Sequence, residues 1–177
     1  MGGGTGNDAV SCRLPMMVRL FLLSLMASAH QPISYPNPFR LLLIAFSNLD
    51  INLAKQMNIL LADFGVKLDN VLMDPLMACL GMGLEYSYSV NERIRIAALM
   101  GDRMLQVPML CDVTSSWEAR EATEENALWG EAGERGAWWE ATTGLAALVS
   151  GAEILIVRSP EAMGILREAI DGLRGGQ

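Results

Sequence analysis

The sequence predicts an α/β fold in which about four short β-strands run parallel and each is followed by a helix. Two observations support this prediction. Apolar runs of strand length recur along the chain, and a segment with apolar residues at helical spacing follows each of them. The runs cover residues 41–46, 71–75, 106–113 and 153–158. Because successive βα units join parallel strands by right-handed crossovers, we expect either an open doubly wound sheet or a stretch of a (β/α)8 barrel.

The first unit begins with the continuous apolar run of residues 41–46, which is typical of a strand covered on both faces. Residues 47–50, with the sequence SNLD, then supply side chains of the types that cap helix N-termini. The helix is expected to end before Gly65, a residue suited to the position after a helix C-cap. Its apolar residues at helical spacing are Leu53, Met57, Leu60, Leu61 and Phe64.

The second unit leads from its strand at residues 71–75 into a long segment, residues 81–89, which contains glycine and tyrosine. We expect this segment to be a loop and the helix to cover residues 90 to about 103. The residues expected to face inward on this helix are Ile94, Ala97 and Ala98.

The third unit places a strand at residues 106–113 and then a polar segment, residues 114–133, which is rich in glutamate and carries two tryptophans. Its helix is predicted over roughly residues 134–150. The apolar residues that indicate this helix are Trp138, Ala141, Leu145, Leu148 and Val149.

The fourth unit has the clearest helix start of the chain. After the strand at residues 153–158, Ser159 is of the N-cap type, Pro160 suits the first helical position and Glu161 supplies an acidic first turn. The apolar positions of the predicted helix are Met163, Leu166, Ile170 and Leu173.

Composition argues against a nucleic-acid partner. The chain of 177 residues has a net charge of -7 and only 13 lysines and arginines, whereas nucleic-acid binders concentrate positive charge. The three cysteines, Cys12, Cys79 and Cys111, form no CxxC pair and are too few for an iron–sulfur cluster. His30, the single histidine, has no cysteine or carboxylate beside it, so no metal site is predicted. A reduced, cytoplasmic setting is the simplest expectation.

Residues 1–40 are expected to form a divergent or disordered N-terminal segment, separate from a partial barrel domain at residues 41–177. The apolar run at residues 20–26 follows two arginines and precedes Ala-Ser-Ala, the pattern of a secretory leader. The run is too short to span a membrane, and the chain has no disulfide framework, so a working leader is the less favoured interpretation. Three prolines make residues 30–38 a turn-rich linker.

Polar residues directly follow every predicted strand, and no glycine-rich phosphate-binding motif does. In a barrel these post-strand positions all lie on the face where sites are built, although each residue alone could equally be a helix cap. The post-strand polar residues are Asn48, Asp50, Asp74, Asp112, Thr114, Arg158 and Ser159.

A series of longer motifs occurs in order along the chain. They are SNLDINLAKQMNIL at residues 47–60, Asp74-Pro75, GMGLEYSYSVNERIR at residues 81–95, GDRML at residues 101–105, Trp129-Gly130, Glu134-Arg135-Gly136 and Trp139-Glu140. Together they closely resemble the small subunit of the corrinoid iron–sulfur protein, whose counterpart in methanogens is the delta subunit of the acetyl-CoA decarbonylase/synthase complex. The resemblance covers about three quarters of the chain.

This resemblance implies the C-terminal half of a (β/α)8 TIM barrel. It further implies that the barrel pairs with a large subunit, which carries the iron–sulfur cluster, and that the two share a cobamide. Such a pair would carry a methyl group from a methyl-pterin to acetyl-CoA synthase in the reductive acetyl-CoA (Wood–Ljungdahl) pathway. Methyl-pterin methyltransferase and acetyl-CoA synthase would be transient partners. The barrel itself would hold the cofactor and not catalyse the transfer.

A cobamide has a wide apolar face with an amide-bearing rim, so its cover should combine flexible glycine loops, aromatic contacts and polar groups. Residues 81–89 have this composition. The candidate cobamide-binding residues are Asn48, Asp74, Gly81, Gly83, Glu85, Tyr86 and Thr114. The helix-borne residues Arg93, Arg95, Arg135 and Glu140 also match the family, but we expect them more often to form structural ion pairs.

The chain departs from the family because only four of the eight βα units are visible. A half-barrel leaves two strand edges unpaired. An upstream truncation or frameshift is the favoured explanation, and assembly with a second half or an isolated fragment are the alternatives. Two other functions stay open. One is a pterin-dependent methyltransferase barrel that uses Asn48, Asp50 and Asp74, and the other is a non-functional remnant.

Overall fold

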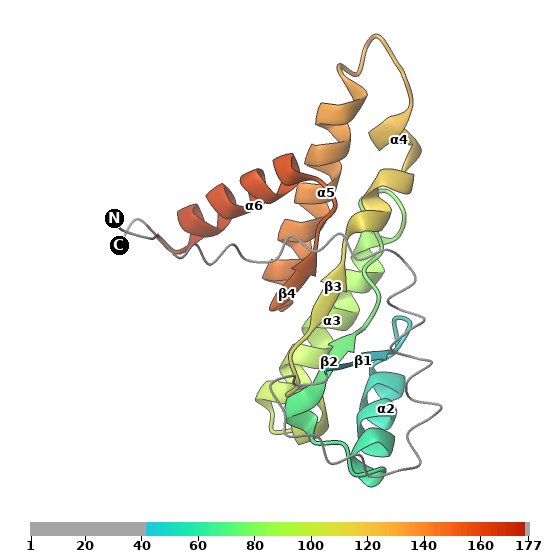
Figure 1. Ribbon diagram of the computed structural model, residues 1–177, viewed down its shortest axis with the longest axis vertical. Coiled ribbons are helices and arrows are strands. Elements are labelled where there is room, and N and C mark those ends of the chain that lie inside the picture. The colour runs from blue at the N-terminus through green and yellow to red at the C-terminus, as the bar shows by residue number, and fades with distance from the viewer. Residues whose placement is uncertain (1–41, 176–177) are drawn as a thin grey trace, which may run out of the picture. The chain divides into compact units, whose positions relative to one another are not determined.

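The computed structural model describes residues 42–175, in which strands and helices alternate (Figure 1). The main elements are β1 (Leu43–Phe46), α2 (Ile51–Asp63), β2 (Val71–Asp74), α3 (Leu84–Leu99), β3 (Leu110–Asp112), α5 (Ala132–Val149), β4 (Ile154–Ile156) and α6 (Pro160–Leu173). The short elements between them are η1 (Leu68–Asn70), η2 (Arg103–Leu105), η3 (Thr114–Glu118) and α4 (Arg120–Thr123). The four predicted βα units are therefore confirmed.

The strands are parallel and follow one another in sequence order. β1 pairs with β2, and β3 pairs with β4. A parallel bridge between Met73 and Met109 joins the two pairs, and the Met73 amide donates to the Pro108 carbonyl at 2.8 Å. A doubly wound sheet would reverse its strand order at a switch point. The sequential order observed here is consistent with half of an α/β barrel.

Side chains of the strands alternate between two faces. On the helix-covered face, Ala45, Met73 and Met109 are buried in one apolar core together with Ile94 of α3. On the other face, the outer strands β1 and β4 keep large apolar side chains between 37% and 48% exposed. These side chains are Ile44, Phe46, Ile154 and Ile156. The sheet is thus apolar on both faces but fully covered on only one.

Local signals set the ends of the first and last helices as predicted. The Asp50 carboxylate caps α2 by accepting from the amides of Asn52 and Leu53, at 2.7 and 3.2 Å. Gly65 follows the end of this helix with φ +83°, a conformation that glycine adopts readily. At α6, the Ser159 hydroxyl accepts from the Ala162 amide at 3.2 Å.

The predicted loop at residues 81–89 is wrong in its second half, because α3 already begins at Leu84. Gly83 takes the N-cap position with φ +101°, and the buried Ser87 hydroxyl accepts from the Ala78 amide at 2.7 Å. These contacts start the helix six residues before the predicted position. The third strand is also shorter than predicted, with only residues 110–112 in regular pairing after Pro108, which has no amide to donate.

The expectations for residues 1–40, including the leader-like run, His30 and Cys12, lie outside the described residues. In the part of the chain that the structure describes, no helix has the length and apolar character needed to cross a membrane.

Candidate functional site

The C-terminal ends of β1 and β2 lie side by side. The Ser47 amide donates to the Asp74 carbonyl at 2.9 Å, and the Leu49 amide donates to the Pro75 carbonyl at 2.8 Å. The pairing of the two strands therefore continues beyond their last residues. It brings the turn that contains the exposed Asn48 next to the buried Asp74.

The backbone in these two turns is strained. Three residues other than glycine have a positive φ in the described chain: Asn48 at +39°, Leu49 at +59° and Leu76 at +73°. The left-handed conformation costs an L-residue roughly 1–2 kcal/mol. The Asp74 carboxylate accepts from the Leu76 amide at 3.0 Å and thereby helps to hold the second turn. Such strain is typical of positions where function, and not local preference, sets the backbone.

A buried hydroxyl without a partner lies at the same place. Ser47 is fully buried, and its Oγ makes no hydrogen bond within the described structure. The buried Ser116 in η3, after β3, has the same property. Sequence analysis did not select either residue, although Ser47 directly follows the apolar run of β1. A buried hydroxyl that lacks a partner is costly, so both positions favour a ligand or another polar group.

The connection from β2 to α3 is anchored on α5. The Leu80 amide donates to the Thr143 hydroxyl at 3.2 Å, and the Leu80 carbonyl accepts from the Trp139 indole at 2.9 Å. Gly81 and Gly83 follow with φ of +81° and +101°, which other residues rarely adopt.

The first turn of α3 presents Glu85 and Tyr86, both of which are exposed. Tyr86 is 66% exposed, and the apolar side chain of Met82 lies open in the preceding turn. The end of β2 therefore carries an accessible aromatic and apolar surface on a firmly anchored segment.

The end of β3 is more completely bonded. The Asp112 carboxylate accepts from both the amide and the hydroxyl of Thr114, at 3.0 and 2.6 Å.

The seven predicted site residues all lie on the C-terminal side of the strands. They form three groups: Asn48 with Asp74, the four residues of the β2–α3 segment, and Thr114 alone.

The end of β4 is held by a buried carboxylate on α5. Glu140 is fully buried and accepts from the Trp117 indole at 2.9 Å and from the amides of Arg158 and Ser159 at 2.5 and 3.0 Å. The Arg158 guanidinium lies 5.2 Å from the centre of the Trp117 ring. A Cβ added to Gly136 would come within 2.3 Å of that ring, so only glycine leaves room for it.

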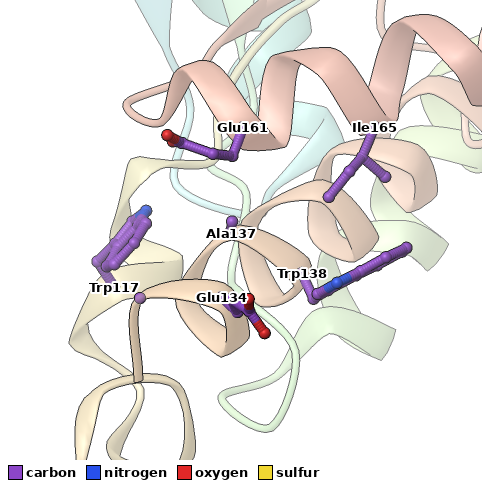
Figure 2. Close-up of a pocket in the computed structure, with 7 residues that line it drawn as sticks. Trp117, Glu134, Ala137, Trp138, Glu161 and Ile165 are labelled. Carbon is purple, nitrogen blue, oxygen red and sulfur yellow. The ribbon is translucent and has the colours of Figure 1, made fainter. Parts of the chain in front are cut away.

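A pocket of about 620 Å³ opens beside Trp117, one of the hydrogen-bond partners of Glu140 (Figure 2). Its lining residues come from η3 and from the first two turns of α5 and of α6: Trp117, Gly133, Glu134, Ala137, Trp138, Glu161 and Ile165. Figure 2 shows Trp117 and Trp138 on opposite sides of Glu134 and Ala137, with Glu161 and Ile165 contributed by α6. None of the residues that sequence analysis proposed for the cobamide lines this pocket.

Three of the four family-matched charged residues have structural partners among the described residues, but only Arg95 forms the ion pair that was expected of them. Arg95 donates to the Gly151 carbonyl at 2.7 Å and forms an ion pair with Glu153, which in turn accepts from the Met109 amide at 2.6 Å. Arg135 donates to backbone carbonyls, including that of Gly130 at 2.6 Å. Glu140 holds β4 as described. Arg93 is exposed, and no described contact assigns it a structural role.

Cys79 and Cys111 are free, buried thiols. Burial raises the pKa of the Cys111 thiol to about 12, and the Asp74 carboxylate acts in the same direction. Burial also raises the pKa of Cys79. Protonated, inaccessible thiols are poor metal ligands and poor nucleophiles. Within residues 42–175, no three or more His, Cys, Asp or Glu side chains are grouped so that they could hold a metal ion.

Comparison with known proteins identifies the family. Residues 34–170 match the family model described as CO dehydrogenase/acetyl-CoA synthase delta subunit. The chain is 37% identical over 139 residues to the acetyl-CoA decarbonylase/synthase complex subunit delta of Methanosarcina mazei, an alignment that covers 75% of this chain and 32% of the relative. The equivalent subunit of Methanothermobacter thermautotrophicus is 37% identical over 150 residues, which cover 81% of this chain and 39% of that protein.

The delta subunit of Methanocaldococcus jannaschii is more distant, at 33% identity over 125 residues, which cover 71% of this chain and 31% of the relative. The chain therefore matches about a third of the length of these known relatives. The family model covers the motifs that first indicated the resemblance, and it covers the strands and helices described above up to residue 170, within α6. The chain belongs to the CO dehydrogenase/acetyl-CoA synthase delta-subunit family.

Proposed function

We propose that this chain helps to hold a cobamide at the C-terminal ends of β1 and β2, as one part of a corrinoid-carrying subunit. One observation carries the proposal beyond family membership. The turns after these adjacent strands combine left-handed Leu49 and Leu76 with the unpartnered, buried Ser47 hydroxyl. Strained backbone and an unsatisfied hydroxyl are retained together where a ligand compensates them.

The residues on this edge fit the chemistry of a cobamide. The corrin ring needs an apolar cover, which the exposed side chains of Phe46, Met82 and Tyr86 can supply. The amides around the ring need hydrogen-bond partners, which the exposed Asn48 side chain can supply.

Each candidate residue has a distinct role in this proposal. Asn48 would bind an amide of the rim, and Thr114, whose hydroxyl proton is donated to Asp112, would accept from another. Asp74 positions the strained turn through the Leu76 amide. Gly81 and Gly83 allow the backbone to approach the ring closely, because no Cβ is present. Glu85 and Tyr86 would cover the rim from the first turn of α3.

A bound cobamide supplies a cobalt centre that can carry a methyl group. In this proposal the chain binds and orients the cofactor and excludes water from it, while a larger partner subunit contributes the iron–sulfur cluster and the rest of the cover. The methyl group would come from a methyl-pterin and pass to acetyl-CoA synthase, in the reductive acetyl-CoA pathway. The chain itself would not be the catalyst.

The pterin-dependent methyltransferase alternative has weaker support. That function would use Asn48, Asp50 and Asp74 as ligands of the pterin. However, the Asp50 carboxylate caps α2 through two amides, and Asp74 is buried and holds the Leu76 amide. Strong binding of a reduced pterin by the isolated chain would nevertheless favour this alternative over the cobamide carrier.

The test is co-elution of the chain with a cobamide-loaded large subunit of the corrinoid iron–sulfur protein, followed by size and by visible absorbance. We expect an equimolar complex that retains the corrinoid absorbance. Tyr86→Ser should weaken the complex about tenfold, as expected for loss of a buried aromatic contact. Leu99→Ser, at the opposite end of the same helix and similarly exposed, is the matched control and should have no effect.

Two outcomes would contradict the proposal. A folded chain that does not associate with the loaded large subunit has no such role. A chain that is unfolded or aggregated with and without the partner would support the remnant interpretation, in which the family sequence persists without the function.

A further inference from the structure

The pocket between η3, α5 and α6 is not explained by cobamide binding, because its lining residues are distinct from those proposed above. Its walls combine two indole rings, of Trp117 and Trp138, with two carboxylates, of Glu134 and Glu161. Ala137 and Ile165 supply apolar surface between them (Figure 2). Aromatic faces and carboxylates around an apolar floor are suited to a flat organic cation.

Three of the four tryptophans already have partners within the chain. Trp117 donates to Glu140 and stacks with Arg158, while Trp139 donates to the Leu80 carbonyl. Trp129 lies under the Arg135 guanidinium, 5.6 Å from it. Trp138 differs from all three, since it is 58% exposed and has neither a hydrogen bond nor a cation over its ring among the described residues.

The charge of the pocket matches a cation. None of its lining residues is basic. The Ser159 hydroxyl donates to the Glu161 carboxylate at 2.7 Å and lowers the pKa of that group, which is therefore ionised at neutral pH. Glu134 is exposed and forms no ion pair in the described part of the chain. The net charge of -7 gives the whole chain the same sign.

We propose that this pocket receives an arginine side chain of a partner protein, with its guanidinium on the Trp138 ring and paired with Glu134, while Glu161 adds negative charge on the Trp117 side of the pocket (Figure 2). Arginine is favoured over lysine because a planar guanidinium can stack on an indole and pair with a carboxylate at once. Stacking of a guanidinium on an indole occurs twice within the described chain, where Arg158 lies over Trp117 and Arg135 lies over Trp129. A protein partner is favoured because tryptophan and arginine are among the residues that most often anchor protein interfaces.

The proposal can be tested on the full chain without cobamide or large subunit, so its failure is independent of the proposed function. The probe is a fluorescein-labelled peptide with one arginine between glycines, measured by anisotropy. The control peptide replaces arginine by citrulline, which has nearly the same shape but no charge. We expect the arginine peptide to bind and the citrulline peptide to bind at least about tenfold more weakly.

Variants localise the binding to the pocket. Trp138→Ala should weaken the arginine peptide about tenfold, and Glu134→Gln should weaken it about threefold. Trp129→Ala and Glu131→Gln, which change the same residue types outside the pocket, should leave it unchanged. Circular dichroism of each variant checks that the chain stays folded.

Four results would overturn the proposal. If the arginine and citrulline peptides bind equally well, the charge of the guanidinium plays no role. If the arginine peptide binds the wild-type chain and a folded Trp138→Ala variant equally well, the pocket is not its binding site. Free arginine that binds as tightly as the peptide would indicate a small-molecule site. Self-association of the chain that Trp138→Ala abolishes would make a second copy the occupant.

Discussion

The C-terminal ends of the first two strands and of the last two strands are built in opposite ways. After β1 and β2, the backbone is left-handed at three residues that are not glycine, and the buried Ser47 hydroxyl has no partner in the described structure. After β4, the buried Glu140 carboxylate satisfies two backbone amides and an indole at once. The first region therefore keeps a strained backbone and an unsatisfied hydroxyl, whereas in the second region the buried carboxylate and its donors satisfy one another.

This difference separates two roles on one edge of the sheet. A region with unsatisfied groups gains stability when a ligand arrives, which is why we propose that the cobamide binds at the β1–β2 end. The buried groups around Glu140 are hydrogen-bonded to one another, so they gain nothing in this way and the region they hold is rigid. The β4 end therefore serves as a platform, which fixes the positions of α5 and α6 and so the shape of the aromatic pocket between them.

The largest expected effect is the loss of the carboxylate that holds the platform. Glu140→Ala leaves the Trp117 indole and the amides of Arg158 and Ser159 buried without an acceptor. We expect the free energy of unfolding to fall by about 3–5 kcal/mol in a urea titration. Glu168→Ala removes an exposed carboxylate from α6 and should change the free energy of unfolding by less than about 0.5 kcal/mol. Equal midpoints for the two variants would show that Glu140 does not hold this region.

A smaller effect is expected where the platform excludes any side chain. Gly136→Ala places a Cβ within 2.3 Å of the Trp117 ring, so the ring must move. Overpacking of this kind destabilises a protein by typically 1–3 kcal/mol. Gly133→Ala on the same helix meets no atom within 4 Å and should stabilise the chain by up to about 1 kcal/mol. Urea titrations followed by tryptophan fluorescence measure both, and a stabilising Gly136→Ala would contradict the tight fit.

The sequence predicted the fold well because its signals are local. The alternation of apolar runs and helical periods, the Asp50 cap and the Ser159-Pro160 start each depend on a few neighbouring residues. The start of α3 was missed because Gly83 can begin a helix as well as belong to a loop. Whether Gly83 begins a helix here depends on the hydrogen bond between the Ser87 hydroxyl and the Ala78 amide, which the spacing of apolar residues in the sequence does not indicate.

The candidate site was less predictable, for two physical reasons. Leucine has no preference for a left-handed backbone, so the residue types at positions 49 and 76 did not predict the positive φ angles found there. The aromatic pocket depends on Trp117, Trp138 and Glu161, which are distant in sequence and meet only because α5 packs against α6. By contrast, the proximity of Asn48 and Asp74 follows from the general rule that parallel strands end at one edge.

The smallest effect tests whether the strain at the β1–β2 end is real. At Leu49, where φ is +59°, the glycine variant should be more stable than the alanine variant by about 1 kcal/mol, because only glycine tolerates this conformation without strain. At Leu60, a partly exposed position within α2, the order should reverse and alanine should be the more stable by about 1 kcal/mol. Thermal unfolding of the four variants gives both differences under the same conditions. If alanine is favoured at both positions, the turn after β1 is not strained, and the contrast with the β4 end loses its energetic basis.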